Sequence, residues 1–209
     1  KVKMKTMNGY LEGDRAIITW CVGHLVTMSY PESYDASLKK WRLDTLPFLP
    51  EKFLYEILPG NAGRQFKVVS ELLCRKDVDS IYVCTDSGRE GEYIYRLVDM
   101  MAGVGDEKKK YRVWIDSQTE EEISREAKPL SDYDDLSAAA YLRAKEDYLM
   151  GINFSRLLSV KYGNDISVFN NTKYTAIAVG RVMTCVLGLI VRRERQIREF
   201  RKTPFYRIV

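Results

Sequence analysis

The sequence holds one histidine, four cysteines and no long apolar run, and each scarcity argues against a class of protein. The lone His24 excludes a histidine-rich metal site and a pair of histidines acting as acid and base. The cysteines form no C-x-x-C pair, which argues against a cysteine zinc site and favours reduced thiols in a cytoplasmic protein; they are Cys21, Cys74, Cys84 and Cys185. No apolar stretch reaches the roughly 20 residues that span a bilayer, and none follows the basic N-terminus, so we expect neither a membrane span nor a signal peptide.

Glycine-rich phosphate loops are missing as well. Neither G-x-G-x-x-G nor G-x-x-x-x-G-K-[ST] occurs in the 209 residues, which disfavours a nucleotide-binding loop of these kinds. The composition is otherwise that of a globular protein, with 45% hydrophobic and 30% charged residues, and the length suits one or two domains.

The charge is unevenly distributed along the chain. Residues 1–50 carry a net charge of +2, residues 51–150 carry −6, and residues 151–209 carry +8. Carboxylates could therefore hold a cation in the middle of the chain, while arginines near the end hold a polyanion. Two ordinary solvated surfaces would explain the same numbers, so charge alone leaves both interpretations open.

Strand and helix patterns alternate through the first 130 residues. A hairpin is expected at 9–22, because two β-type runs flank a short turn there. The other strands are expected at 79–84 and 111–115, and the helices at 64–75, at 90–102 and from Thr119 onward. This alternation is typical of a parallel sheet with crossover helices, so the first part is predicted to be α/β.

The pattern becomes mainly helical after Pro129. One long helix is expected from Leu136 to about Ser159, and a polar loop from Gly163 to Thr175. A last helix is expected from the apolar stripe Leu187, Ile190, Val191, Ile197 and Phe200. The boundary between the α/β part and the helical part is predicted near residues 130–135.

The most informative segment is TDSGREGE at residues 85–92, where a strand should end and a helix begin. Ligands of open parallel sheets bind at that edge. Asp86 and Glu90 would converge if Gly88 allows a tight turn, and such a pair suits Mg²⁺; Arg89 could contact a phosphate. An acidic helix start, in which the glutamates merely complement the helix dipole, is the alternative.

This segment resembles the acidic loop of the Toprim domain, and the chain as a whole resembles a bacterial type IA DNA topoisomerase of the topoisomerase III kind. Six segments carry the resemblance in order: GYLEGDRAIITWCVGHLVTM at 9–28, WRLDTLPFLP at 41–50, TDSGREGE at 85–92, RVWIDSQTEEEI at 112–123, RAKEDYLMGINFSR at 143–156 and VGRVMTCVLGLIVRRERQIREF at 179–200.

The resemblance implies a fold, a cofactor and a partner. It implies a Toprim-like α/β domain over 1–131 that lacks its first strand, a helical domain over 132–200 that binds single-stranded DNA, and the start of a further domain at 201–209. Mg²⁺ would be held by Asp86 and Glu90, with Glu90 and Arg89 as catalytic residues. The parent enzyme would be a monomer that breaks, passes and rejoins single DNA strands. Another Toprim enzyme, such as a primase or nuclease, and a non-catalytic DNA-binding module are the alternatives.

The same resemblance gives a set of DNA-binding residues. They are His24, Arg143, Asp147, Asn153, Ser155, Arg156, Gly180, Arg181 and Thr184. The residues themselves support part of this set, because a helix N-terminus at Gly180 favours a phosphate. They also leave structural roles open, since Arg143 and Asp147 have the i, i+4 spacing of an ion pair and His24 could be a structural histidine.

The sequence departs from the family pattern in three ways. Gly88 stands where many members have a second aspartate, and Met183 and Cys185 stand where the family has Gln and Pro. The family's first strand, with a catalytic glutamate followed by Lys-Pro, and its nucleophilic tyrosine have no counterpart here. We therefore expect an internal fragment that binds Mg²⁺ and DNA but does not cleave DNA by itself.

Overall fold

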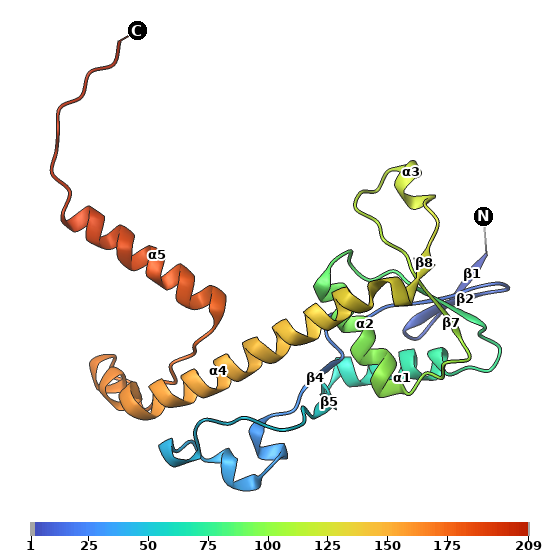
Figure 1. Cartoon of the computed structure of the whole chain (residues 1–209), viewed down its shortest axis with the longest axis horizontal. Coiled ribbons are helices and arrows are strands. Elements are labelled where there is room, and N and C mark those ends of the chain that lie inside the picture. Colours follow the sequence, from blue (N-terminus) through green and yellow to red (C-terminus); the bar gives the residue numbers. More distant parts are fainter. Residues whose placement is uncertain (1–2, 209) are drawn as a thin grey trace. The chain divides into compact units, whose positions relative to one another are not determined.

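The computed structural model describes residues 3–208, which form a mixture of helices and small sheets (Figure 1). The chain divides into two compact units. The first takes in the described parts of Lys1–Ala36 and Pro50–Lys145, and the second takes in those of Ser37–Leu49 and Glu146–Val209. The domain limits expected from the sequence stay a prediction.

The first unit opens with antiparallel strands. β1 (Met4–Met7), β2 (Tyr10–Gly13) and β3 (Ile17–Thr19) form a three-stranded sheet, and Tyr10 pairs with Thr19 across the β2–β3 hairpin. The hairpin expected from the sequence is therefore confirmed. A second antiparallel pair follows from β4 (Val26–Met28) and β5 (Tyr55–Ile57).

The predicted crossover unit is present in the third sheet. β6 (Ser80–Val83) leads through α2 (Arg89–Ala102) to β7 (Lys109–Arg112), and the two strands pair in parallel. The next strand, β8 (Lys128–Pro129), pairs with β7 antiparallel. The short α3 (Glu120–Ile123) lies in the excursion between β7 and β8 (Figure 1), and the Thr119 hydroxyl accepts a hydrogen bond from the Glu122 N–H, as the capping pattern predicted. The α/β class is confirmed, although within residues 3–208 only β6 and β7 pair in parallel.

The core of the first unit lies between this sheet and two helices. α1 (Asn61–Leu73) and α2 contact each other, and each buries one apolar face. The inward-facing strand residues Ile81 and Val83 pack with Leu97 and Val98 of α2. Burial of each such side chain stabilises the fold by about 1.5–3 kcal/mol. This packing holds β6 against α2 and so fixes the position of the loop between them.

The second unit contains most of α4 (Asp134–Phe169), which is longer than the sequence pattern predicted. The loop expected from Gly163 is wrong as far as Phe169, because the helix continues with Gly163 and Ser167 buried and its Asn and Asp side chains exposed. A Cβ at Gly163 would lie 2.8 Å from the Thr175 carbonyl oxygen. The glycine therefore permits the returning chain to pass close to the helix.

The last helix, α5 (Arg181–Arg198), begins where the sequence predicted, with Gly180 as its N-terminal cap residue. Its apolar side chains are exposed in the structure. Four short 3₁₀ turns complete the described chain: η1 (Pro31–Ser33), η2 (Ala36–Lys39), η3 (Leu43–Thr45) and η4 (Leu130–Tyr133). Within residues 3–208, none of the helices combines the length and the hydropathy that crossing a bilayer requires.

Candidate metal and nucleic-acid sites

The acidic loop joins the end of β6 to the first turn of α2. Asp86, Arg89 and Glu90 are all exposed there. The loop lies at the carboxyl end of a parallel strand, which is the edge where open α/β sheets bind ligands. The position expected from the sequence is thus confirmed, and the carboxylates of Asp86 and Glu90 are open to solvent.

Close backbone packing fixes the shape of this loop. A Cβ at Gly91 would lie 2.1 Å from the Asp86 carbonyl oxygen, so only glycine fits at this position. The Thr85 hydroxyl donates to the Gly91 carbonyl at 2.8 Å. Ser87 ties the loop to the segment after β7, because its Oγ donates to the Ile115 carbonyl and accepts from the Ile115 N–H, both at 2.8 Å.

The third carboxylate of the segment, Glu92, faces the core and is fully buried. Its Oε1 accepts from Arg96 Nε at 2.8 Å, and its Oε2 accepts from Arg112 Nε at 3.0 Å. A carboxylate held by two guanidinium groups in the interior is a structural charge pair. Asp86 and Glu90 therefore remain as the exposed acids of the segment.

Arg112 is a functional candidate that the sequence reasoning missed. It is 0% exposed, and its guanidinium donates to the backbone carbonyls of Val83, Thr85 and Asp86 at 2.9, 2.7 and 2.6 Å. These three carbonyls belong to the end of β6 and to the acidic loop. Arg112 thereby connects the loop backbone to the buried Glu92.

His24 lies against one of the expected metal ligands. Its Nε2 is 2.7 Å from Glu90 Oε1, and both side chains are partly exposed. The imidazole also meets the ring of Tyr93 edge-on, with 6.1 Å between centroids. The structure therefore brings together a residue expected to contact DNA and a residue expected to hold the metal.

The tyrosines behind this site are poorly suited to nucleophilic chemistry. Burial raises the pKa of Tyr93, and the neighbouring Tyr55, Tyr141 and Glu90 raise it further. Burial, with Tyr55 beside it, also raises the pKa of Tyr141 to about 12. A raised pKa keeps the phenol protonated near neutral pH, whereas a nucleophile must lose its proton.

The exposed acids have the oxygen donors that Mg²⁺ prefers. Mg²⁺ is commonly held by one or two carboxylates together with phosphate oxygens and water, and Asp86 and Glu90 supply that number. Over residues 3–208 there is no cluster of three or more His, Cys, Asp or Glu side chains placed to hold a metal ion. Gly88 contributes no side-chain ligand, so the remaining ligands would have to come from phosphate and water.

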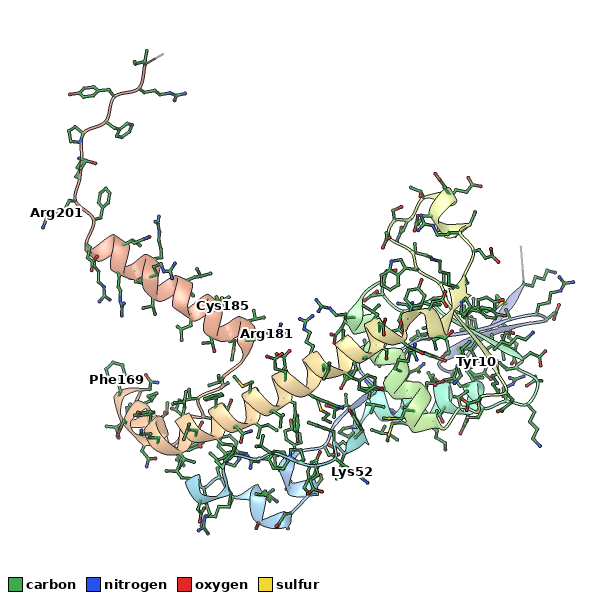
Figure 2. The ribbon with its side chains drawn as sticks, in the orientation of Figure 1. Tyr10, Lys52, Phe169, Arg181, Cys185 and Arg201 are labelled. Carbon is green, nitrogen blue, oxygen red and sulfur yellow. The ribbon has the colours of Figure 1, made fainter. Side chains whose placement is uncertain are left out.

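The second unit contains a cavity of about 800 Å³ between α4 and the start of α5. Figure 2 shows Arg181 at the N-terminal end of α5 and Cys185 one turn further along. The cavity is lined by Glu146, Asp147, Met150, Gly151, Phe154 and residues 179–185. Four of the expected DNA-binding residues therefore lie around one cavity: Asp147, Gly180, Arg181 and Thr184.

Hydrogen bonds hold the walls of this cavity. Both oxygens of Asp147 accept from Arg181, so Asp147 pairs across the cavity and not with the Arg143 partner that the helical spacing allowed. Ser155 Oγ accepts from the Val179 N–H at 2.8 Å, which fixes the chain just before Gly180. The start of α5 is thereby anchored to α4 on both sides of its cap.

Two of the expected DNA-binding side chains have structural partners in the second unit. Asn153 accepts from the Phe48 N–H at 2.6 Å and donates to the Phe48 carbonyl at 2.9 Å. Arg156 is 5% exposed, donates to the Leu38 carbonyl at 2.8 Å and lies over the ring of Trp41. Both side chains hold the 37–49 segment against α4. Arg143 lies on α4 and is half-buried.

Comparison with known proteins identifies the family of both parts of the chain. The Toprim domain model, which describes a metal-binding domain, matches residues 1–117, and the bacterial DNA topoisomerase model matches residues 131–209. The "Putative DNA topoisomerase 3" of Staphylococcus aureus strain bovine RF122 / ET3-1 and the "DNA topoisomerase 3" of strain MRSA252 are each 39% identical over 202 residues, or 95% of this chain. The chain spans about a quarter of the length of these relatives, at 26%. The chain therefore belongs to the Toprim-containing bacterial type IA DNA topoisomerases, with proteins of the topoisomerase 3 kind among its relatives.

Proposed function

We propose that this chain provides the Mg²⁺ site and part of the single-stranded-DNA groove of a type IA DNA topoisomerase. The whole protein would cut one DNA strand, pass another through the break, and rejoin the ends. One observation carries the proposal: the exposed Asp86 and Glu90 stand at the end of β6 in a Toprim domain, and a DNA topoisomerase region follows. The chain would work in the cytoplasm, and the parent protein would be a monomer.

Asp86 and Glu90 would hold the metal, which when bound neutralises phosphate charge and fixes the DNA backbone for rejoining. Arg89 is exposed between them in sequence and would bind a neighbouring phosphate through its planar guanidinium. His24, in contact with Glu90, would orient that carboxylate while remaining within reach of the DNA. These are roles of binding and positioning, for which no residue of this chain needs to form a covalent bond to DNA.

The cavity beside α5 would take the DNA backbone. A phosphate at the N-terminus of α5 meets free backbone N–H groups and the positive end of the helix dipole, close to Arg181 and Thr184. Arg143 belongs to the first unit and stays a predicted DNA contact that is separate from this cavity. Ser155 would act by holding one wall of the groove, because its hydroxyl accepts from the Val179 N–H just before Gly180. Asn153 and Arg156 would act indirectly, through the 37–49 segment that they hold against α4.

The two alternative functions, another Toprim enzyme and a non-catalytic DNA-binding module, explain fewer of these observations. A primase or nuclease shares a Toprim domain but gives no reason for the DNA topoisomerase match at 131–209. A DNA-binding module without a metal gives no reason for two exposed carboxylates in a loop held as closely as this one. It remains testable, since DNA binding would then be independent of Asp86.

Fluorescence anisotropy with a labelled single strand tests the groove. We expect tighter binding to a single strand than to a duplex, with affinity falling steeply as salt rises. Arg181→Gln should flatten the slope of log affinity against log salt by about 0.7 for one lost phosphate contact. The matched control is Arg195→Gln, which removes the same charge near the other end of α5. Equal slopes for the parent chain and Arg181→Gln would remove Arg181 from the DNA interface.

A further inference from the structure

A buried charge cluster lies directly beneath the acidic loop. It consists of Glu92 and Arg96 on α2 and Arg112 at the end of β7. Glu92 and Arg112 are both 0% exposed, so their charges are removed from water. Glu92 is balanced by Arg112 and by the partly exposed Arg96. Burying such an ion pair costs desolvation free energy, and two hydrophobic side chains in its place would often stabilise the fold at least equally. Its presence calls for a role beyond stability.

The hydrogen bonds of Arg112 point to that role. One nitrogen, Nε, donates to Glu92. The other two donate to backbone carbonyls, and these belong to Val83, Thr85, Asp86 and Val113. Three of the four acceptors lie in residues 83–86, at the end of β6 and the start of the acidic loop. The guanidinium therefore binds the loop backbone from below, at the residue that carries the exposed Asp86 carboxylate.

The loop is otherwise short of regular backbone pairing at this point. Past Val83 the β6–β7 ladder ends, and the carbonyls of Thr85 and Asp86 turn toward the interior, where Arg112 donates hydrogen bonds to both. A buried carbonyl without a donor costs about 1–3 kcal/mol, so the direction of these carbonyls depends on Arg112. The direction of the Asp86 carbonyl in turn fixes the side on which its side chain leaves the loop.

We propose that Arg112 is a positioning residue for the metal site: it holds the backbone of residues 83–86 so that the Asp86 carboxylate faces solvent beside the start of α2. The proposal rests on the proposed function for its metal, but the placement of the loop is a property of the chain alone. Lysine cannot replace arginine here, because one ammonium group cannot donate to Glu92 and to three separated carbonyls in a planar fork.

Arg96 provides a matched control within the same cluster. It also bonds Glu92, at 2.8 Å, and its other contacts are the Leu130 carbonyl and Asp134. None of these contacts reaches the acidic loop. Arg96→Lys and Arg112→Lys thus both weaken the pairing of Glu92, and only Arg112→Lys removes the bonds to the loop.

Hydrogen exchange of the metal-free chain is the first measurement. With Arg112→Lys, the amides of residues 84–91 should exchange at least about tenfold faster than in the parent, while those of α1 keep their rates. With Arg96→Lys, the loop amides should stay within about twofold of the parent. If Arg112→Lys does not fold, Arg112→Met combined with Glu92→Gln removes both buried charges and is measured in its place. Loop exchange that is unchanged, or that changes equally with Arg96→Lys, would overturn the proposal.

The second measurement adds Mg²⁺ and follows the amide chemical shifts of the loop. Arg112→Lys should weaken Mg²⁺ binding at least about tenfold, and Arg96→Lys should leave it within about twofold. If the parent chain itself shows no Mg²⁺ response at this loop, the metal part of the proposed function fails, and hydrogen exchange alone decides whether Arg112 positions the loop. An Arg112→Lys chain with parental Mg²⁺ affinity would contradict the positioning role.

Discussion

The Arg181 guanidinium and the Asp147 carboxylate meet through two parallel hydrogen bonds, from Nε to Oδ1 at 3.0 Å and from Nη2 to Oδ2 at 2.8 Å. This is the geometry with which arginine also binds phosphate. Asp147 thus occupies the face of Arg181 that a DNA phosphate would use. Both side chains are about half exposed, at 53% and 43%, so the pair can open at little cost.

Replacement of Asp147 tests this competition. Asp147→Asn should raise the affinity for a single strand at low salt by up to about fivefold, since an exposed ion pair contributes at most about 1 kcal/mol. The measurement is fluorescence anisotropy with a labelled oligonucleotide.

Glu146→Gln is its control, because Glu146 lines the same cavity and loses the same charge but is not the partner of Arg181. A gain of equal size in both variants would mean that general charge, and not the ion pair, limits binding.

Glycine is required at Gly91 and is not required at Gly88. Gly91→Ala should destabilise the chain by about 1–3 kcal/mol in urea unfolding, because the added Cβ would overlap the Asp86 carbonyl. Gly88→Ala should change stability by less than about 0.5 kcal/mol, since a Cβ there meets no atom within 4 Å and the φ of 172° is ordinary extended backbone. Equal losses in the two variants would refute the close approach of loop and helix.

Ionisation of the partly buried Tyr141 should lower the stability of the fold at high pH. Burial raises the pKa of Tyr141 to about 12, above the value of about 10 for a free tyrosine. The unfolded chain therefore loses this proton first, so the stabilising contribution is complete below pH 10 and is lost as pH rises from 10 to 12.

Urea unfolding followed between pH 8 and pH 12 measures this loss, with tyrosinate absorbance as the second signal. Tyr141→Phe should make the decline shallower. The comparison is Tyr206→Phe, which changes an exposed tyrosine. A decline that is the same in both variants would show that Tyr141 does not titrate late.

The chain by itself should bind DNA without forming a covalent adduct. The tyrosine beside the acidic site, Tyr93, has a pKa raised by burial and packs against His24, so it is not prepared to attack a phosphate. Denaturing electrophoresis of a labelled single strand, incubated with the chain and Mg²⁺, should show no protein-linked band. A band that disappears when one tyrosine of the chain is changed to phenylalanine would show that the nucleophile lies within these residues.

Much of the crossover unit could be read from the sequence, because local signals and tertiary packing agree there. TDSGREGE combines turn residues with acids at a strand end, and the structure has β6, loop and α2 in that order. The end of α4 could not be read in the same way. Asn and Asp favour loops locally, but here they lie on the exposed side of a helix. The Ser155 and Ser159 hydroxyls bind the returning chain against this helix, and Gly163 leaves room for it.

The charge partners beneath the site were also hidden from sequence reasoning. Arg112 lies at an inward position of β7, two residues after Lys110, and the two basic residues pair with Glu92 and Asp99 of α2. The signal was present as two bases at i, i+2 on a strand and two acids at i, i+7 on the preceding helix. It could not be used without knowing the strand register, since one residue of shift would turn both bases outward.

Mg²⁺ binding at Asp86 is the most direct test of the central claim. Mg²⁺ is titrated into the chain while the amide chemical shifts of residues 84–92 are followed, with Asp86→Asn as the loss variant and Gly88→Asp as the gain variant. We expect weak, saturable binding at this loop that Asp86→Asn abolishes. Gly88→Asp should strengthen binding by about tenfold, because open space at residue 88 allows one more carboxylate. Shifts that are equal in the parent and in Asp86→Asn would contradict a metal site in this loop.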